Sequence, residues 1–264
     1  MYRVEFAVPE NAPRGLTLSI ETLMDNAPKA IGCSVTNLDD WGDANLYVAC
    51  GFSKEMPSRY ALLFWDESGD VNAANRAIME GAFLTVFASP EHLKREKRKW
   101  TGTQWPCPPV AIPPAVDDEL FTNEGGPRSG AVWAGPYEAG KGLRKAIDWA
   151  CENKMSLDVY GIGRPFLWLR RYQGDIINLD DWDNKIRIWD EVSHLEMPEI
   201  YNRHKVFVSL PMWFDPCPRA CIEASMCGCR VVTNGENGFA SWDGVRNSSR
   251  EFWDKFLKAA SSGG

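Results

Sequence analysis

Short apolar runs alternate along the chain with longer segments of helical periodicity. In the first half, runs rich in β-branched and aromatic residues predict strands at residues 2–8, 31–36, 45–51, 60–65, 83–89 and 110–116. Apolar residues at helical spacing predict helices at residues 16–26, 72–81 and 90–100. Ser89 followed by Pro90 is typical of the start of the last helix. Strands that alternate with helices are typical of parallel sheets joined by crossover helices, so the predicted fold class is α/β.

The alternation is interrupted at residues 122–130, T-N-E-G-G-P-R-S-G, which predicts a linker. Beyond it, strands are expected at residues 131–135, 157–163, 185–192, 206–211 and 230–236, and helices at residues 141–153, 197–204 and 219–228. The chain is therefore expected to form two Rossmann-like domains, residues 1–125 and 126–245. Residues 246–264 carry Phe252, Trp253, Phe256 and Leu257 at helical spacing, which predicts an amphipathic tail helix seated on an apolar surface.

The composition is that of a globular protein of 264 residues, with 44% hydrophobic residues and a net charge of −7. This acidic balance disfavours an overall electrostatic attraction to nucleic acid. Two local basic-aromatic segments, residues 94–100 with Trp105 and residues 169–172, could bind a phosphate backbone or an anionic lipid surface. A solvated helix face is the commoner explanation of such a run.

The eight cysteines include no C-x-x-C unit, and most of them lie within apolar runs. This pattern is typical of buried thiols in a reducing compartment, and the spacing from Cys217 to Cys229 is not a usual zinc-ligand spacing. We therefore expect neither disulfides nor a bound metal. Because no run of eighteen apolar residues and no signal sequence is visible, we expect no transmembrane segment and a cytoplasmic location.

A glycine-rich turn follows the first strand of the second half. The segment A-G-P-Y-E-A-G-K-G at residues 134–142 ends in Lys141 at a predicted helix start, where backbone N–H groups and the ammonium group could bind phosphate. Residues 161–163, G-I-G, end the next strand and are a weaker signal of the same kind. The alternative is a structural turn with a surface lysine, since neither spacing is that of a known phosphate loop.

Two acidic residues flank the start of another predicted helix. Asp215 lies in the strand-to-helix turn and Glu223 follows eight residues later in the helix. Acids at this place could bind sugar or ribose hydroxyls, while helix N–H groups and Arg219 hold phosphate oxygens. The alternative is a capping aspartate with a glutamate on the helix surface.

This segment resembles the retaining, nucleotide-sugar-using GT-B glycosyltransferases of the E-x7-E type (glycosyltransferase group 1, family 4-like). The motif reads D-x7-E here, and the following A-S-M-C-G-C-R-V-V-T-N-G-E-N-G is similar to the family's small-residue helix and V-V strand. F-A-S-P-E-H-L-K-R-E at residues 87–96, I-P-P-A-V-D-D-E-L-F at 112–121 and the 134–142 turn are similar to family segments in the same order. The resemblance covers residues 83–240.

The resemblance implies a GT-B fold, with two parallel-sheet domains facing across a cleft and a C-terminal helix returning to the N-terminal domain. The N-terminal domain would take the acceptor and the C-terminal domain the nucleotide sugar. It further implies transfer of a hexose from a UDP- or GDP-sugar to an acceptor hydroxyl, with retention of configuration and without a metal or other cofactor.

The resemblance also implies roles for single residues. Glu223 would hold the donor ribose, Asp215 would reach the transferred sugar, and Lys141 would neutralise the diphosphate. The leaving group would be stabilised near the start of the helix, and further donor contacts would come from the two glycine-bearing strand ends. These additional residues are Cys217, Pro218, Arg219, Gly135 and Gly163.

The sequence departs from the family pattern at several positions. Pro136 stands where the family has a phosphate-binding arginine, so Arg219 or Arg164 is expected to substitute. The family's amino-terminal histidine is absent, and Asp66 or Glu67 is the expected replacement. Gly15 is expected in the first glycine-bearing loop that faces the donor.

Several alternatives remain open. The acceptor could be a glycan, a lipid carrier, a small molecule or, as in phage-type enzymes, a modified DNA base. A non-catalytic nucleotide-sugar-binding protein is a different class that the same residues allow. An NAD-dependent oxidoreductase is disfavoured because no G-x-G-x-x-G follows the first strand.

Overall fold

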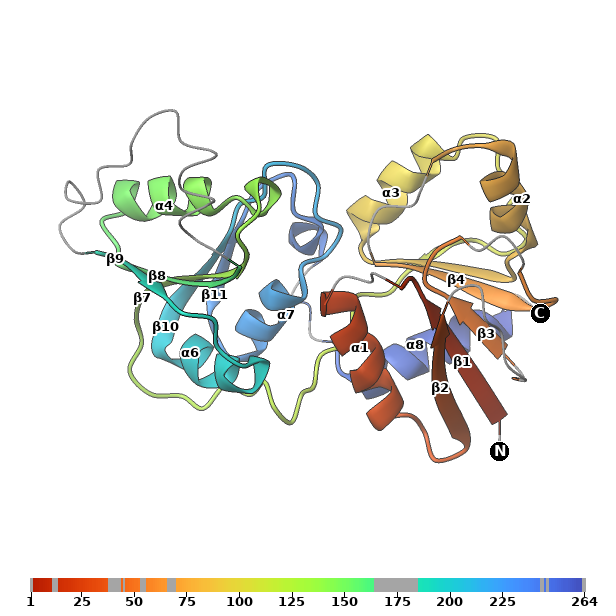
Figure 1. Cartoon of the computed structure of the whole chain (residues 1–264), viewed down its shortest axis with the longest axis horizontal. Coiled ribbons are helices and arrows are strands. Elements are labelled where there is room, and N and C mark those ends of the chain that lie inside the picture. The colour runs from red at the N-terminus through yellow and green to blue at the C-terminus, as the bar shows by residue number, and fades with distance from the viewer. Residues whose placement is uncertain are drawn as a thin grey trace. The chain divides into compact units, whose positions relative to one another are not determined.

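The computed structural model of the chain consists of two units, each with its own parallel sheet (Figure 1). It describes residues 2–10, 14–37, 44, 46–52, 56–65, 70–163, 185–242, 245 and 247–262. Unit 1 comprises Met1–Asp117 and Asn247–Gly264, and unit 2 comprises Asp118–Arg246. The predicted α/β fold with two parallel sheets is confirmed.

Unit 1 contains a six-stranded sheet in the order β2-β1-β3-β4-β5-β6, and each neighbouring pair is parallel. The strands are β1 (Tyr2–Val8), β2 (Ile31–Asn37), β3 (Leu46–Ala49), β4 (Tyr60–Phe64), β5 (Leu84–Phe87) and β6 (Val110–Ala111). Strands β3 and β4, L-Y-V-A and Y-A-L-L-F, are apolar along their whole length because both faces of the sheet are covered. In β4, Tyr60 and Leu62 pack into one core, while Ala61 and Leu63 pack into the other.

Within the described residues of unit 1, four helices cover this sheet. They are α1 (Arg14–Asp25), α2 (Ala73–Gly81), α3 (Pro90–Lys99) and α8 (Ser249–Ser262). Helices α1 and α8 lie on one face, and α2 and α3 lie on the other (Figure 1).

The tail helix α8 is part of the core of unit 1. Phe252, Trp253 and Phe256 are fully buried, and Trp253 Nε1 donates to the carbonyl oxygen of Leu23 at 3.0 Å. Leu257 was expected on the same apolar stripe, but it is 37% exposed. The buried stripe continues instead through Ala259 and Ala260, which lie closer to its line along the helix.

Helix α3 begins at the predicted cap. The hydroxyl oxygen of Ser89 accepts the backbone N–H of His92 at 3.1 Å, and Pro90 occupies the first turn. We expect Ser89→Ala to lower the free energy of unfolding by about 1 kcal/mol, because that N–H loses its partner at a fully buried position. The measurement is urea unfolding followed by circular dichroism. Ser58→Ala, at an exposed serine, is the control and should change stability by less than about 0.5 kcal/mol; equal losses in both variants would contradict the capping role.

Unit 2 contains a five-stranded parallel sheet in the order β11-β10-β7-β8-β9. The strands are β7 (Ser129–Pro136), β8 (Leu157–Ile162), β9 (Ile186–Trp189), β10 (His204–Ser209) and β11 (Arg230–Thr233). Helix α4 (Leu143–Glu152) covers one face, and α6 (Met197–Arg203) and α7 (Arg219–Met226) cover the other (Figure 1). Short 3-10 turns are η1 (Ala139–Lys141), η3 (His194–Glu196) and η4 (Gly238–Ser241).

The strand order of unit 2 reverses beside β7. The chain runs from β7 outward through β8 to β9 and then returns to place β10 on the opposite side of β7. The loops that leave β7 and β10 at the carboxyl edge of the sheet therefore lead to helices on opposite faces, α4 and α7 (Figure 1). Open parallel sheets bind their ligands at such a switch point.

Several predicted boundaries are wrong, among them the following three. The strand expected at residues 110–116 ends at Ala111, because Pro113 and Pro114 have no N–H group to continue the ladder. The helix expected at residues 141–153 starts at Leu143, since Gly142 has a left-handed φ of 71°. His204, expected in a helix, is the first residue of β10.

Among the helices of the described ranges, none is both long and apolar enough to cross a membrane. All eight cysteines are free thiols.

Candidate functional site

An ion pair joins the two loops that follow β7 and β10 at the switch point of unit 2. Lys141 Nζ lies 2.8 Å from Asp215 Oδ2, and their side chains are 39% and 14% exposed. Lys141 follows β7 and Asp215 follows β10, the two strands between which the strand order reverses. The remaining oxygen of Asp215, Oδ1, accepts no hydrogen bond from the part of the chain that the structure describes. Both charges are therefore accessible at the carboxyl edge of the sheet.

Glycines set the path of the Lys141 loop. A Cβ atom on Gly142 would collide with the carbonyl oxygen of Leu210, and one on Gly140 would collide with the indole ring of Trp213. The backbone N–H of Met212 donates to the carbonyl oxygen of Gly140 at 2.9 Å. The loops after β7 and β10 thus touch through backbone, and this contact brings Lys141 to Asp215.

A third loop, which follows β11, holds Asp215 from the other side. The Asp215 N–H donates to the carbonyl oxygen of Glu236, and the Gly238 N–H donates to the carbonyl oxygen of Asp215, both at 2.8 Å. The Asn237 side chain of the same loop donates to Ser209 Oγ at 2.9 Å, at the end of β10. The backbone of Asp215 is therefore fixed within three adjoining loops.

Glu223 is a buried carboxylate on α7. Its Oε1 atom accepts from Arg219 Nε at 2.7 Å and lies 2.8 Å from His194 Nε2. Its other oxygen, Oε2, has no hydrogen-bond partner among the described residues. A glutamate on the helix surface, the structural alternative, is excluded because Glu223 is only 4% exposed.

Cys221 is a fully buried thiol in the first turn of α7. Burial raises the pKa of its thiol to about 12, and the charges of Asp215 and Lys141 both act on it, in opposite directions. Burial also raises the pKa of Cys217 well above its ordinary value, with smaller contributions from Cys221 and Asp215. Both thiols are therefore protonated at neutral pH and are poor nucleophiles.

The N-terminus of α7 lies next to Asp215 in the chain. Pro218 is the N-cap residue, and no side chain caps the helix within the residues described. The positive end of the helix dipole favours an anion at such a place. Arg219, expected to hold phosphate, has its Nε directed to Glu223 and is almost fully buried.

The other predicted site residues lie in several places. Gly135 and Pro136 end β7, and Gly163 follows β8 with a φ of 104° and no atom within 4 Å of a Cβ placed on it. Gly15, expected in a loop, lies instead in the first turn of α1 in unit 1, because the helix begins at Arg14. Asp66, Glu67 and Arg164 lie outside the described residues.

His194 is a site residue that the sequence did not reveal. The only local signal was the S-H-L-E capping box. In this motif the Ser193 hydroxyl accepts the backbone N–H of Leu195, and the Glu196 carboxylate accepts the backbone N–H of Ser193. That motif predicts a helix start, but it does not indicate that the histidine reaches Glu223 twenty-nine residues away.

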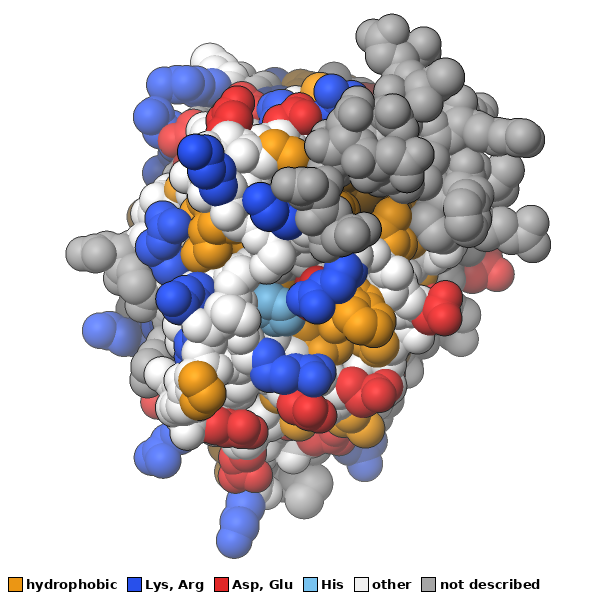
Figure 2. Space-filling model, turned by 90° about the vertical axis from the view of Figure 1, so that its left-hand side faces the viewer, with side chains coloured by type: hydrophobic (Ala, Val, Ile, Leu, Met, Phe, Trp, Pro, Cys, Tyr) orange, Lys and Arg blue, Asp and Glu red, His pale blue; other side chains and the backbone are white. Residues whose placement is uncertain are grey.

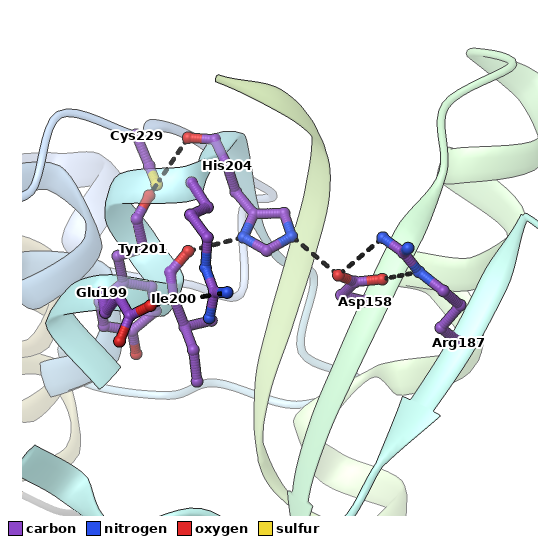
Figure 3. Close-up of polar contacts among 8 residues, drawn as sticks. Asp158, Arg187, Glu199, Ile200, Tyr201, His204 and Cys229 are labelled. Carbon is purple, nitrogen blue, oxygen red and sulfur yellow. Dashed lines mark hydrogen bonds and ion pairs between the residues drawn. The ribbon is translucent and has the colours of Figure 1, made fainter. Parts of the chain in front are cut away.

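A second charged cluster lies at the amino ends of the strands of unit 2. Arg187 Nε and Nη2 donate to the two oxygens of Asp158 at 2.6 and 2.9 Å, and His204 Nε2 lies 3.1 Å from Asp158 Oδ2 (Figure 3). The other ring nitrogen of His204 contacts the carbonyl oxygen of Ile200 at 2.6 Å. Asp158 is the second residue of β8 and His204 the first of β10, so this cluster ties α6 to the sheet at the edge opposite Lys141.

Basic and acidic side chains are interspersed on the face that Figure 2 draws.

The segment at residues 94–100 lies mostly on α3, where Glu91 pairs with Lys94 and Arg95 at 3.4 and 3.3 Å. Residues 169–172, the other basic segment, are outside the described residues.

Neither protein-family models nor curated proteins match the chain by sequence. Solved structures match its fold. AviGT4, a glycosyltransferase involved in avilamycin A biosynthesis, has a TM-score of 0.67 and 13% identity, with 99% of this chain and 88% of that chain covered. A glycosyltransferase from Rickettsia africae has a TM-score of 0.68 and 11% identity, with 99% and 88% covered.

HepE from Anabaena, solved with UDP and glucose, has a TM-score of 0.66 and 12% identity, with 100% of this chain and 94% of that chain covered. The chain thus has the GT-B glycosyltransferase fold. At this level of identity the likeness concerns the fold alone.

Proposed function

We propose that this chain is a glycosyltransferase that transfers a hexose from a UDP- or GDP-sugar to an acceptor hydroxyl, with retention of configuration and without a metal. The observation that carries the proposal is the Lys141–Asp215 pair at the switch point of unit 2, beside a helix start without a side-chain cap. HepE, which has the same fold, was solved with UDP-glucose, and this supports a nucleotide-sugar donor.

Each charged group of the candidate site has a binding role that agrees with its contacts. Oε2 of Glu223 accepts the ribose hydroxyls, since Oε1 is already occupied by Arg219 and His194. Lys141 binds the diphosphate, and the backbone near Cys217 and Pro218 contributes the positive end of α7. Asp215, with Oδ1 available, binds hydroxyls of the transferred sugar.

The same arrangement supports the chemical step. When the bond between the anomeric carbon and the diphosphate breaks, negative charge builds on the leaving oxygen, and a cation already in place stabilises it. Lys141 is held by Asp215 until the donor binds, so its ammonium group is oriented beforehand. In the retaining reaction, the departing phosphate takes the proton of the attacking hydroxyl.

Unit 1 takes the acceptor in this proposal. Gly15 is the exception, because it contacts the donor in this proposal; it lies in the first turn of α1, after β1, which is at the switch point of its own sheet, between β2 and β3. Asp66 replaces the amino-terminal histidine of the family, and Arg164 supplies a second cation in unit 2. The acceptor is a hydroxyl of a glycan, a lipid carrier, a small molecule or a modified DNA base, and transfer assays decide among them.

The test is a thermal-shift panel of nucleotide sugars, followed by transfer assays with the donor that binds. A donor at about one hundred times its Kd is expected to stabilise the chain by about 2.7 kcal/mol, and the corresponding nucleoside monophosphate much less. We expect turnover that persists in EDTA and a product with the configuration of the donor by NMR. Binding without turnover across all acceptors would contradict catalysis, and the absence of any shift would contradict the donor site.

A further inference from the structure

We propose that His194 is a positioning residue that orients Glu223 toward the ribose of the nucleotide. The inference rests on the proposed function. It adds to the proposed site a histidine that lies on a different element from Glu223, the acid that it orients. His194 lies in η3, whereas Glu223 lies in α7.

The contact geometry fixes one oxygen of the carboxylate. Arg219 Nε and His194 Nε2 lie 2.7 and 2.8 Å from the same atom, Glu223 Oε1. A carboxylate oxygen can only accept, so Nε2 of His194 carries the proton in this contact. Arg219 lies one turn earlier in α7, and His194 approaches from a separate element, so the two donors together define the plane of the carboxylate.

His194 is itself held in place. Its turn is closed by the Ser193 and Glu196 capping box, in which the Ser193 N–H donates to Glu196 Oε2 at 2.8 Å. The ring packs against Phe121, with ring centroids 5.1 Å apart, and Phe121 is 1% exposed. The His194 side chain is 19% exposed and thus sits at the rim of the site rather than in the core.

Arg219 and His194 act differently on Glu223 because they differ in charge and position. Arg219 neutralises the carboxylate from within its own helix, so removal of His194 leaves no unpaired buried charge. Without His194, however, the carboxylate can rotate about its last torsion, because the single contact from Arg219 Nε does not prevent that rotation. This rotation lowers the affinity of the carboxylate for ribose hydroxyls, because binding must then fix its orientation. The loss of residues that orient a binding group generally weakens binding in this way.

The experiment compares UDP with 2′,3′-dideoxy-UDP, which lacks both ribose hydroxyls, or the guanosine pair if the panel selects it, by titration calorimetry. In His194→Leu, the affinity for the ribonucleotide is expected to fall about tenfold, while the affinity for the dideoxynucleotide stays nearly unchanged. His194→Gln, whose amide N–H can reach Oε1, should restore most of the loss. In steady-state assays, KM for the donor should rise in His194→Leu with little change in kcat.

His204→Gln is the matched control, because this histidine lies at the opposite edge of the same sheet. It should leave the ratio of the two affinities as in the wild type. A ribose preference that survives in His194→Leu, or an equal loss for both nucleotides, overturns the role of His194. A wild-type chain that binds both nucleotides equally overturns the role of Glu223 in the proposed function, and with it this inference.

Discussion

Glu223→Gln is expected to lose nucleotide-dependent stabilisation. The substitution keeps an oxygen that accepts from Arg219 and His194, but it replaces the other carboxylate oxygen with an amide that donates. The ribose hydroxyls then lose a charged acceptor, and a hydrogen bond to a charged group contributes about 1.5–3 kcal/mol. We expect the Kd of the donor to rise about 100-fold, and the thermal shift at a fixed donor concentration to vanish.

The fold of this variant is measured separately. Arg219 loses its charged partner while the hydrogen bond remains, so the free energy of unfolding without ligand should fall by about 1–3 kcal/mol. The matched control is Glu199→Gln, since Glu199 is exposed on α6 and pairs with Arg203 at 3.6 Å. Donor affinity equal to wild type in Glu223→Gln, or lost equally in Glu199→Gln, would contradict the assignment.

Lys141→Met is expected to lower kcat by a factor of about 10² to 10³. A cation that meets charge developing in the transition state contributes about 2.7–4 kcal/mol, and methionine keeps most of the length without the charge. Stability should change by less than about 1 kcal/mol, because the side chain of Lys141 is 39% exposed and the pair with Asp215 is screened by water. The measurement is single-turnover transfer at saturating donor, together with urea unfolding.

The control for this variant is Arg144→Met. Arg144 lies in the first turn of α4, close to Lys141 in the chain, but it pairs with Asp148 on the exposed side of the helix at 2.9 Å. Its removal takes away one positive charge from the same region and should leave kcat within about twofold. A similar fall in both variants would indicate a general effect of charge rather than a contact with the diphosphate.

Much of the fold could be predicted from the sequence because parallel strands are covered on both faces. Their residues are then apolar without interruption, as in Y-A-L-L-F of β4, and the amphipathic helices between them stand out. The predicted strand ends were less accurate where backbone chemistry decides them. Pro113 and Pro114 end β6 early, and Gly142 separates Lys141 from α4.

The part of the candidate site that could be predicted consists of the residues that directly follow strands. Lys141 and Asp215 both come after strands, and the carboxyl ends of parallel strands share one edge. That the two strands are neighbours depends on the return of the chain after β9, which no local pattern encodes. For the same reason His194 was missed, since its contact with Glu223 depends on how η3 packs against α7.

A crystal structure of the chain with UDP, or with GDP if the panel selects it, tests the central claim most directly. We predict that Lys141 Nζ turns from Asp215 to a diphosphate oxygen, and that Glu223 Oε2 accepts from the ribose within about 3 Å. A nucleotide bound at the edge that carries Asp158 and His204, or one bound elsewhere with the Lys141–Asp215 pair intact, would contradict the account.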